Sequence, residues 1–219
     1  MDPAESPLTP EVVRAALALP SPLPAIPPPA SARPAAVVVP VRLDEAPRAL
    51  CVFRSRALRE HPGEVAFPGG KCDRDDASLE ATALRELREE LAVSPGEVTL
   101  LGALTPIPVI TGRYLIHPFV AALDPRARPR VASAETERIA ELPLLAWLEG
   151  GRRHGAVASS FGDAPILLPH FEVEDRILYG ASAFIFFELI SRLARFRGRE
   201  LAPPVVTNEL PWAGRYREP

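Results

Sequence analysis

The sequence contains little cysteine, and its apolar runs are short. Two cysteines, Cys51 and Cys72, occur in 219 residues. A single pair makes no disulfide framework in a chain of this length, so we expect reduced thiols and a cytoplasmic protein. The strongest apolar run, 181–190, is interrupted by Ser182 and Glu188, and no run reaches the roughly 18 residues that span a bilayer. Because no basic segment followed by an apolar one opens the chain, we expect neither a signal peptide nor a membrane partner.

The chain also lacks an excess of positive charge. The formal net charge is -3 and the pI is about 5.9, so composition predicts no nucleic-acid partner. Lys71 is the only lysine, and the other strongly basic side chains are all arginine. Since alanine and proline are abundant too, this pattern indicates a GC-rich coding bias. We therefore give the high arginine count no functional weight.

The 27 prolines gather mainly near the two ends of the chain. Thr9 and Pro10 form a good helix start, as N-cap and first helical residue. The helix that follows has an apolar face of Val12, Val13, Ala16 and Leu19. Residues 20–34 cannot continue a helix and should be extended, as a surface strap or, alternatively, as a ligand for an SH3-type domain. We expect a proline-rich N-terminal helix and strap at 1–34, a folded domain at 35–198 and a loosely packed proline-rich tail at 199–219.

The middle of the chain is rich in strand patterns. Runs at 35–41 and 48–54 flank a turn and predict a hairpin, in which Pro40 favours an edge position or a bulge. Helical patterns occupy about 76–91 and 181–197. Further extended segments are expected at 64–67, 98–104, 113–123 and 139–145, and a second hairpin at 165–171 with 176–178, whereas 147–161 is poorly patterned. This order predicts an α/β sandwich, a mixed sheet with a helix on each face.

The stretch from Phe67 to Val93 combines a glycine turn with an acidic helix. Gly69 and Gly70 let the backbone approach closely and can offer a bare carbonyl to a cation. For the helix we expect Asp75 or Asp76 as the N-cap. Its core-facing stripe is expected to comprise Ala77, Ala81 or Leu84, Leu87 and Leu91.

Three carboxylates gather near the end of this helix. Glu86 and Glu90 are four residues apart and share a face, with Glu89 to one side. Hard cations such as Mg²⁺ and Mn²⁺ prefer oxygen ligands of this kind, and Arg85 can hold the Glu89 carboxylate in place. The alternative, an exposed face of salt bridges, is typical of such charge runs. The adjoining glycine turn favours the metal site.

This stretch resembles the Nudix box, G-x5-E-x7-R-E-U-x-E-E-x-G-U, in which U is a bulky aliphatic residue. Gly70 supplies the glycine, residues 85–90 supply R-E-U-x-E-E in register, and Val93 supplies the final aliphatic residue. Two positions differ. Asp76 stands where the first glutamate is expected, and one extra residue separates it from the R-E-U-x-E-E run. Ala92 replaces the last glycine.

The upstream residues resemble a longer signature, that of the Nudix subfamily that hydrolyses coenzyme A. The matching positions are Arg54, Ser55, Arg59, Gly63 and Phe67–Gly70. Cys51 and Val52 depart from the usual Leu-Thr of this subfamily, which does tolerate an aspartate and a longer loop in the box. The resemblance covers roughly residues 35–195 and is most specific over 54–93. It implies a Nudix-type α/β/α sandwich with a mixed β-sheet between helices.

In Nudix enzymes, metal ions neutralise a pyrophosphate and activate a water for in-line attack at phosphorus. The resemblance implies that Mg²⁺ or Mn²⁺ is held by Glu86, Glu89 and Glu90, with help from the Gly70 carbonyl. It also implies that Arg85 orients a carboxylate, so that Glu86, Arg85 and Glu89 form the catalytic group.

The general base varies within this family. Glu86 is the first choice, because a box glutamate can take this role. A glutamate on a distant loop is the alternative, and Glu137 and Glu135 lie on the polar run before the extended segment predicted at 139–145. For both, the residue type favours plain surface charge over this role.

Coenzyme A would be cleaved to 3′,5′-ADP and 4′-phosphopantetheine. Its extra 3′-phosphate favours arginine contacts, so we expect Arg54, Arg59 and Lys71 to bind the substrate, with structural ion pairs as the alternative for the arginines. The second expectation is a hydrolase of another nucleoside diphosphate derivative, such as ADP-ribose, NADH or a dinucleoside polyphosphate. The third, a non-catalytic Nudix-like binding module, is disfavoured because all three box glutamates are present. The expected partner is thus a small nucleotide, and the family allows a homodimer.

Overall fold

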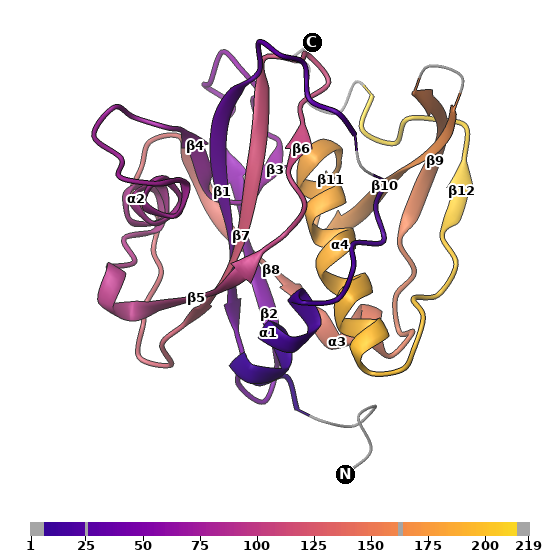
Figure 1. Cartoon of the computed structure of the whole chain (residues 1–219), viewed down its shortest axis with the longest axis horizontal. Helices are drawn as coiled ribbons and strands as arrows, with labels where there is room; N and C mark the ends of the chain where they lie inside the picture. The colour runs from indigo at the N-terminus through magenta and orange to yellow at the C-terminus, as the bar shows by residue number, and fades with distance from the viewer. Residues whose placement is uncertain (1–6, 25, 162–163, 214–219) are drawn as a thin grey trace.

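The computed structural model describes residues 7–24, 26–161 and 164–213. In these ranges the chain forms two β-sheets, which lie on either side of helix α4 (Gly180–Phe196) in Figure 1. The main sheet contains β1 (Arg33–Arg42), β2 (Arg48–Arg54), β3 (Val65–Ala66), β4 (Gly69–Lys71), β5 (Val98–Ala103), β6 (Ile107–Pro108), β7 (Tyr114–Leu123) and β8 (Thr136–Pro143). The smaller sheet contains β9 (Gly155–Phe161), β10 (Ala164–Val173), β11 (Arg176–Leu178) and β12 (Val205–Thr207).

Strand β1 is central to the main sheet, whose order is β3-β2-β1-β7-β5. It pairs in parallel with β7, and it forms the predicted hairpin with β2. Because side chains alternate along a strand, β1 contributes to two hydrophobic cores. Ala36 and Val38 belong to the core that includes Leu87 of helix α2 (Leu79–Leu91), whereas Val39 and Val41 belong to the other core.

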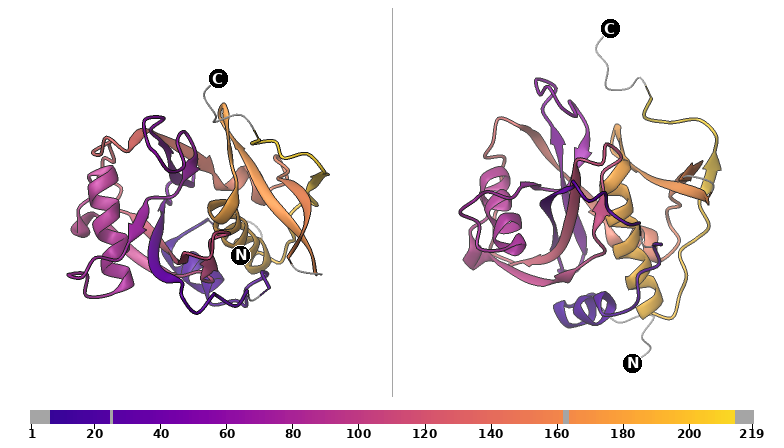
Figure 2. Two further views of the ribbon diagram at one scale, coloured as in Figure 1. Left: turned by 90° about the horizontal axis from the view of Figure 1, so that it is seen from above. Right: turned by 45° about the horizontal axis from the view of Figure 1, so that its top comes forward.

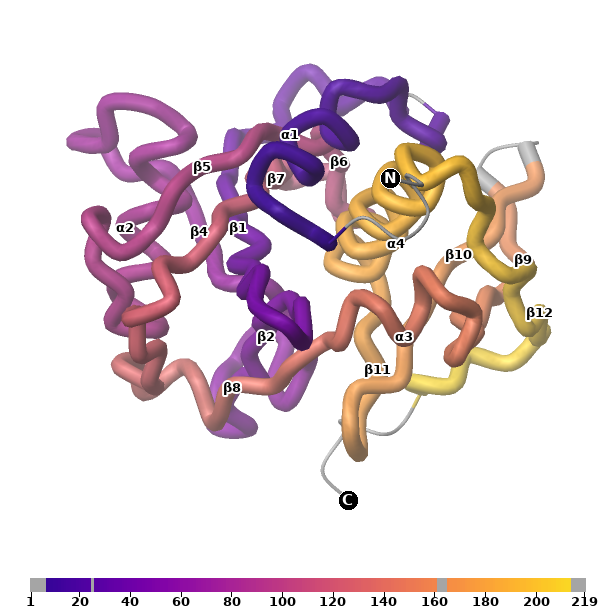
Figure 3. Tube along the Cα trace, turned by 90° about the horizontal axis from the view of Figure 1, so that it is seen from below, coloured from indigo at the N-terminus to yellow at the C-terminus, as the bar shows by residue number. Residues whose placement is uncertain are grey.

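Helices cover both faces of the main sheet. Helix α2 lies on one face, and α4 lies on the other, as the view from above in Figure 2 shows. Helix α1 (Pro10–Leu17) packs beside α4, close to it in Figure 3. A short helix, α3 (Leu144–Leu148), follows β8. The predicted sandwich, a mixed sheet with a helix on each face, is confirmed.

A buried ion pair joins the N-terminal helix to the domain. Glu188 is fully buried and accepts hydrogen bonds from the Thr105 amide (3.0 Å), the Thr105 hydroxyl (2.7 Å) and Arg192 (2.6 Å). Arg192 also donates to the carbonyl of Leu17 at the end of α1. As predicted, Thr9 caps this helix and Pro10 begins it. The proline-rich segment 20–32 that follows has no helix among its described residues.

Long-range strand pairing accounts for features that local patterns did not predict. Pro40 was expected at an edge or a bulge, but it lies in the interior strand β1. It falls between the β1 residues that pair with β4 and those that pair with β2. On that side of β1, therefore, no strand needs a hydrogen bond from a backbone N–H at this position. Strand β9, in the poorly patterned region, is set by its register with β10. The tail was expected to be loosely packed, and none of its described residues is buried, although β12 pairs with β9 and Arg153 donates to the Pro203 and Pro204 carbonyls.

No helix within the described ranges combines the length and the apolar character needed to cross a bilayer. Both cysteines are free thiols, and burial raises the pKa of Cys51 to about 12. Cys51 therefore behaves as a small core residue on β2.

Candidate active site

The glycine turn packs between strand β1 and helix α2. Strand β4 pairs antiparallel with residues 35–37 of β1. A Cβ atom on Gly69 would lie 2.5 Å from the Ala36 carbonyl oxygen, and one on Gly70 would lie 2.4 Å from Glu86 Oε1. Because only glycine permits such approaches, these two residues bring the turn against the α2 carboxylates.

The start of α2 differs from the prediction. Ser78 is the N-cap and accepts a hydrogen bond from the Ala81 amide at 3.2 Å. Asp75 and Asp76 precede the helix. The Asp76 carboxylate does not cap it, and instead accepts hydrogen bonds from Arg85 and from the Thr82 hydroxyl. Ala77 is exposed, contrary to the predicted stripe. The buried residues of α2 are Thr82, Ala83, Leu87, Glu90 and Leu91.

Arg85 connects the loop before α2 with the carboxylates on it. Its Nε and one terminal nitrogen each donate to Asp76 at 3.0 Å, and that nitrogen also donates to the Lys71 carbonyl at 3.0 Å. The other terminal nitrogen donates to Glu86 (2.9 Å) and Glu89 (3.2 Å). The Arg85 guanidinium holds the pKa of Asp76 well below its usual range, and Asp76 in turn raises the pKa of Arg85. Arg85 thus fixes carboxylates from two segments.

Glu90 is the most deeply buried carboxylate of the group. It is only 8% exposed, and the Gly69 amide donates to its Oε1 at 3.4 Å. Burial raises the pKa of Glu90 to about 7, against the opposing effect of the Gly69 amide. The negative charges of Glu86 and Glu135 add to the rise, while Arg54 opposes it. Burial also raises the pKa of Glu86, although Arg85 opposes this.

These residues fit a hard divalent cation by their chemistry. The donors of Glu86, Glu89, Glu90 and the Gly70 carbonyl are all oxygens, as Mg²⁺ and Mn²⁺ prefer. A carboxylate buried with one long hydrogen bond also gains from a nearby positive charge. In the described part of the chain, no three His, Cys, Asp or Glu side chains are already gathered as a metal cluster. Arg85 is the cation that contacts Glu86 and Glu89.

The two candidate loop glutamates have different surroundings. Glu135 lies beside the site: its carboxylate is 3.9 Å from Arg54, its carbonyl accepts from the Ser55 amide at 2.8 Å, and its charge acts on Glu90. Glu137 lies within β8 and accepts two hydrogen bonds from Arg176, at 2.9 and 2.7 Å. Glu135 is therefore the loop glutamate close to the α2 carboxylates.

The predicted substrate-binding residues lie at separate positions around the site. Arg54 ends β2, and its Nε is buried without a hydrogen-bond partner among the described residues. Arg59 is exposed on the loop between β2 and β3. Lys71 ends β4, with its Nζ 5.6 Å from the centre of the Tyr114 ring. Arg33 lies 5.0 Å from the same ring and was not predicted, because only the pairing of β1 with β7 brings it there.

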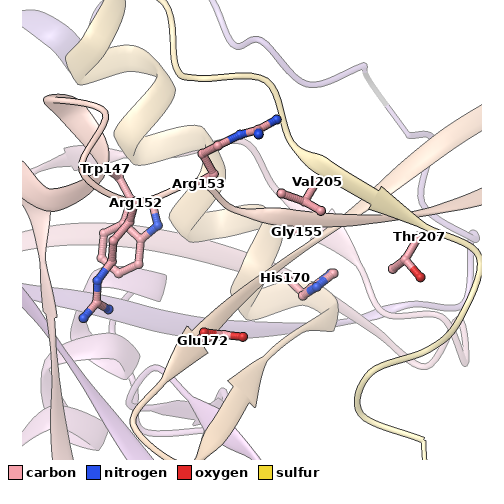
Figure 4. Close-up of a pocket in the computed structure, with 8 residues that line it drawn as sticks. All are labelled: Trp147, Arg152, Arg153, Gly155, His170, Glu172, Val205 and Thr207. Carbon is pink, nitrogen blue, oxygen red and sulfur yellow. The ribbon is translucent and has the colours of Figure 1, made fainter.

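A cavity of about 420 Å³ lies elsewhere, between α3 and the smaller sheet. It is lined by Trp147, Arg152, Arg153, Gly155, His170, Glu172, Val205 and Thr207 (Figure 4). Among the described residues that line it, Glu172 is the one carboxylate, and Arg153 donates to the Pro203 and Pro204 carbonyls of the tail. Since this cavity lacks clustered oxygen donors, we place the candidate active site at α2.

Comparison with known proteins identifies the family to which the chain belongs. A family model described as NUDIX domain matches residues 32–154, which include the glycine turn and all of α2. The chain belongs to the Nudix family. The predicted Nudix family is confirmed. The predicted enzyme class, a Nudix hydrolase, is also the class that the names of the relatives below give.

Relatives in two bacteria carry the name "Uncharacterized Nudix hydrolase NudL". The protein from Citrobacter koseri is 42% identical over 56% of this chain and 63% of its own length, so the match leaves over a third of that relative uncovered. The protein from Shigella flexneri serotype 5b is 38% identical over 74% of this chain and 83% of its own length. A solved structure, a MutT/nudix family protein from Enterococcus faecalis, is 18% identical with a TM-score of 0.50, covering 78% of this chain and 66% of that chain. It shows a shared fold.

Proposed function

We propose that this Nudix protein hydrolyses the pyrophosphate bond of coenzyme A or its derivatives. The observation that carries the proposal is the position of Arg54, a residue of the upstream signature, next to the α2 carboxylates. Its charge acts on Glu90, and its contact with Glu135, at 3.9 Å, is longer than a hydrogen bond. Its guanidinium therefore keeps donors for a phosphate oxygen. Arg59 and Lys71 are proposed to bind other phosphates of the same substrate.

The α2 carboxylates have distinct parts in this reaction. Glu86, Glu89 and Glu90, with the Gly70 carbonyl, would hold Mg²⁺ or Mn²⁺. When bound, such an ion supplies charge neutralisation on the diphosphate and a more acidic water. Arg85 fixes the carboxylates of Glu86 and Glu89, which keeps them from separating under mutual repulsion.

The chemical step is a hydrolysis at phosphorus. The oxygen of a water bonds to one phosphorus while the bridging P–O bond breaks, and the bridging oxygen leaves with the other phosphate group. The water proton passes to a carboxylate. Glu86 is our first choice for this base, because a glutamate of the box can take this role. Glu135 is the second, because it lies on a loop beside Glu90.

Glutamine variants of the two loop glutamates separate these assignments. If Glu135 is the base, Glu135→Gln should lower kcat by roughly 10²- to 10⁴-fold with little change in metal affinity. If Glu86 is the base, the same variant should keep kcat within about threefold of wild type. Glu137→Gln is the matched control and should alter kcat little, because Glu137 is paired with Arg176. Steady-state kinetics with metal titration distinguishes the outcomes.

A substrate panel tests the proposed activity itself. With Mg²⁺ or Mn²⁺, we expect coenzyme A to yield 3′,5′-ADP and 4′-phosphopantetheine, and Arg54→Met to raise KM for coenzyme A by about 10- to 100-fold. The same variant should affect ADP-ribose, which lacks the 3′-phosphate, less strongly. Chromatography of the products gives the answer. Turnover of ADP-ribose without release of 3′,5′-ADP from coenzyme A would refute this substrate, and no turnover of any pyrophosphate would favour a binding module.

A cytoplasmic setting and a small-molecule partner belong to the same proposal. Two free cysteines, one of them buried, are compatible with a reducing compartment. A homodimer is also proposed, and its test is the mass of the protein in solution.

A further inference from the structure

A hairpin beyond the matched Nudix region reaches back to the loop that follows Arg54 and carries Arg59. The hairpin is formed by β10 and β11, which pair from Phe171–Leu178 to Val173–Arg176. The loop, residues 55–64, connects β2 with β3 and includes Arg59. Two of its backbone conformations are left-handed, at His61 (φ 55°) and Gly63 (φ 71°). Since His61 is not glycine, this conformation needs support from its surroundings.

Arg176 supplies the first support. It is 4% exposed, at the start of β11, and donates to the Gly63 carbonyl at 2.8 Å. The same guanidinium holds the Glu137 carboxylate and lies 4.5 Å from the centre of the Phe53 ring. The loop is thereby joined to two strands of the main sheet through one planar cation, a geometry that lysine cannot reproduce.

Tyr179 supplies the second support, from the residue before α4. Its hydroxyl donates to Glu64 Oε1 at 2.6 Å, and His61 Nδ1 lies 3.0 Å from the same oxygen. The Glu64 carbonyl also accepts from the Arg54 amide at 2.8 Å. Glu64 therefore connects the beginning and the end of the loop, and Tyr179 fixes Glu64.

The hairpin itself is anchored independently of the loop. Arg138 on β8 pairs with Glu174 and Asp175 in the turn between β10 and β11. It also lies 3.8 Å from the centre of the Phe53 ring. Because the hairpin is held by β8, it can serve as a fixed reference for the loop.

We infer that Arg176 and Tyr179 are positioning residues for substrate binding. They hold the loop 55–64, which carries Arg59 and whose Glu64 carbonyl accepts from the Arg54 amide, so that both arginines face the phosphates. Neither Arg176 nor Tyr179 touches the reacting atoms. This inference rests on the proposed function, since it concerns the same site. It predicts that loosening either support weakens substrate binding while the hydrolytic step, set by α2, stays intact.

The test uses two conservative variants, Tyr179→Phe and Arg176→Lys. We expect each to raise KM for coenzyme A about 5- to 20-fold, with kcat within about twofold of wild type. Hydrogen exchange of the Arg54 amide, which donates to Glu64, should become at least about tenfold faster. The matched control is Arg153→Met, which frees the tail carbonyls in the same half of the chain, and it should change neither quantity.

The outcomes separate this inference from the proposed function. Unchanged KM in both variants, with or without faster exchange, would overturn the positioning role, as would a loss confined to kcat. If the wild-type protein does not cleave coenzyme A, the proposed substrate is refuted, but the positioning role of Arg176 and Tyr179 is not. KM is then compared on the pyrophosphate of the panel that is turned over, and the exchange measurement needs no substrate.

Discussion

Replacing Glu90 by glutamine is expected to abolish turnover and, at the same time, to stabilise the folded protein at pH 8. The loss of turnover follows from the proposed role of Glu90 as a metal ligand, because a neutral amide is a weaker ligand for a hard cation. The gain in stability follows from burial: glutamine keeps an oxygen that accepts the Gly69 amide, while the buried charge is removed.

The sign and the pH window follow from the raised pKa. The folded-state pKa of Glu90 is about 7, whereas the usual value is 4.5. Folding therefore favours the protonated form, and the charge destabilises the native state increasingly from about pH 4.5 to 7 and fully above pH 7. At 1.36 kcal/mol per unit, this amounts to about 3 kcal/mol as an upper value. The stabilisation should vanish below about pH 4, where both states are protonated.

Denaturant unfolding in the presence of a chelator, at pH 8 and at pH 4, measures this effect. Glu89→Gln is the matched control, because the Glu89 side chain is 49% exposed and should change the free energy of unfolding by less than about 1 kcal/mol at either pH. Added Mg²⁺ should stabilise wild type but not Glu90→Gln. A Glu90→Gln protein with normal turnover would show that the metal assignment is wrong.

Local patterns predicted the elements whose residues are close in sequence. The first hairpin, helix α4 and the register of Glu86, Glu89 and Glu90 on α2 follow from spacing alone. The cap of α2 was mispredicted because Asp76, a good cap by residue type, is drawn to Arg85 nine positions later. Sequence spacing ranks competing local hydrogen bonds poorly when one of them is charge-assisted.

Contacts between segments that are distant in the sequence could not be predicted from local patterns. Glu135 and Glu137 are two residues apart and look alike as sequence, yet one lies beside Glu90 and the other is paired with Arg176, 39 positions away. The difference arises because β8 begins at Thr136, between the two, which leaves Glu135 on the loop and places Glu137 in the strand. No local sequence signal distinguishes two such glutamates, because their roles depend on residues that are distant in the sequence.

Alanine at Gly69 should destabilise the fold, whereas alanine at the adjacent Gly70 should impair turnover and leave stability nearly unchanged. At Gly69 the new Cβ would lie 2.5 Å from the Ala36 carbonyl oxygen and 2.6 Å from the Val37 Cα. These are backbone atoms of the central strand and cannot move aside. We expect Gly69→Ala to lower the free energy of unfolding by about 3 kcal/mol or more, with activity lost as a consequence.

At Gly70 the new Cβ would meet Glu86 Oε1 at 2.4 Å and Cδ at 2.7 Å, the far end of a flexible side chain. The carboxylate can rotate away, so stability should change by less than about 1 kcal/mol, whereas turnover should fall about 100-fold because Glu86 leaves its place. Gly96→Ala, with no atom within 4 Å of the new Cβ, is the control for glycine replacement. Thermal unfolding and kinetics of the three variants test this. Full activity in Gly70→Ala would mean that the position of Glu86 against the turn is not needed for catalysis, and the assignment of the metal site to this turn would fall with it.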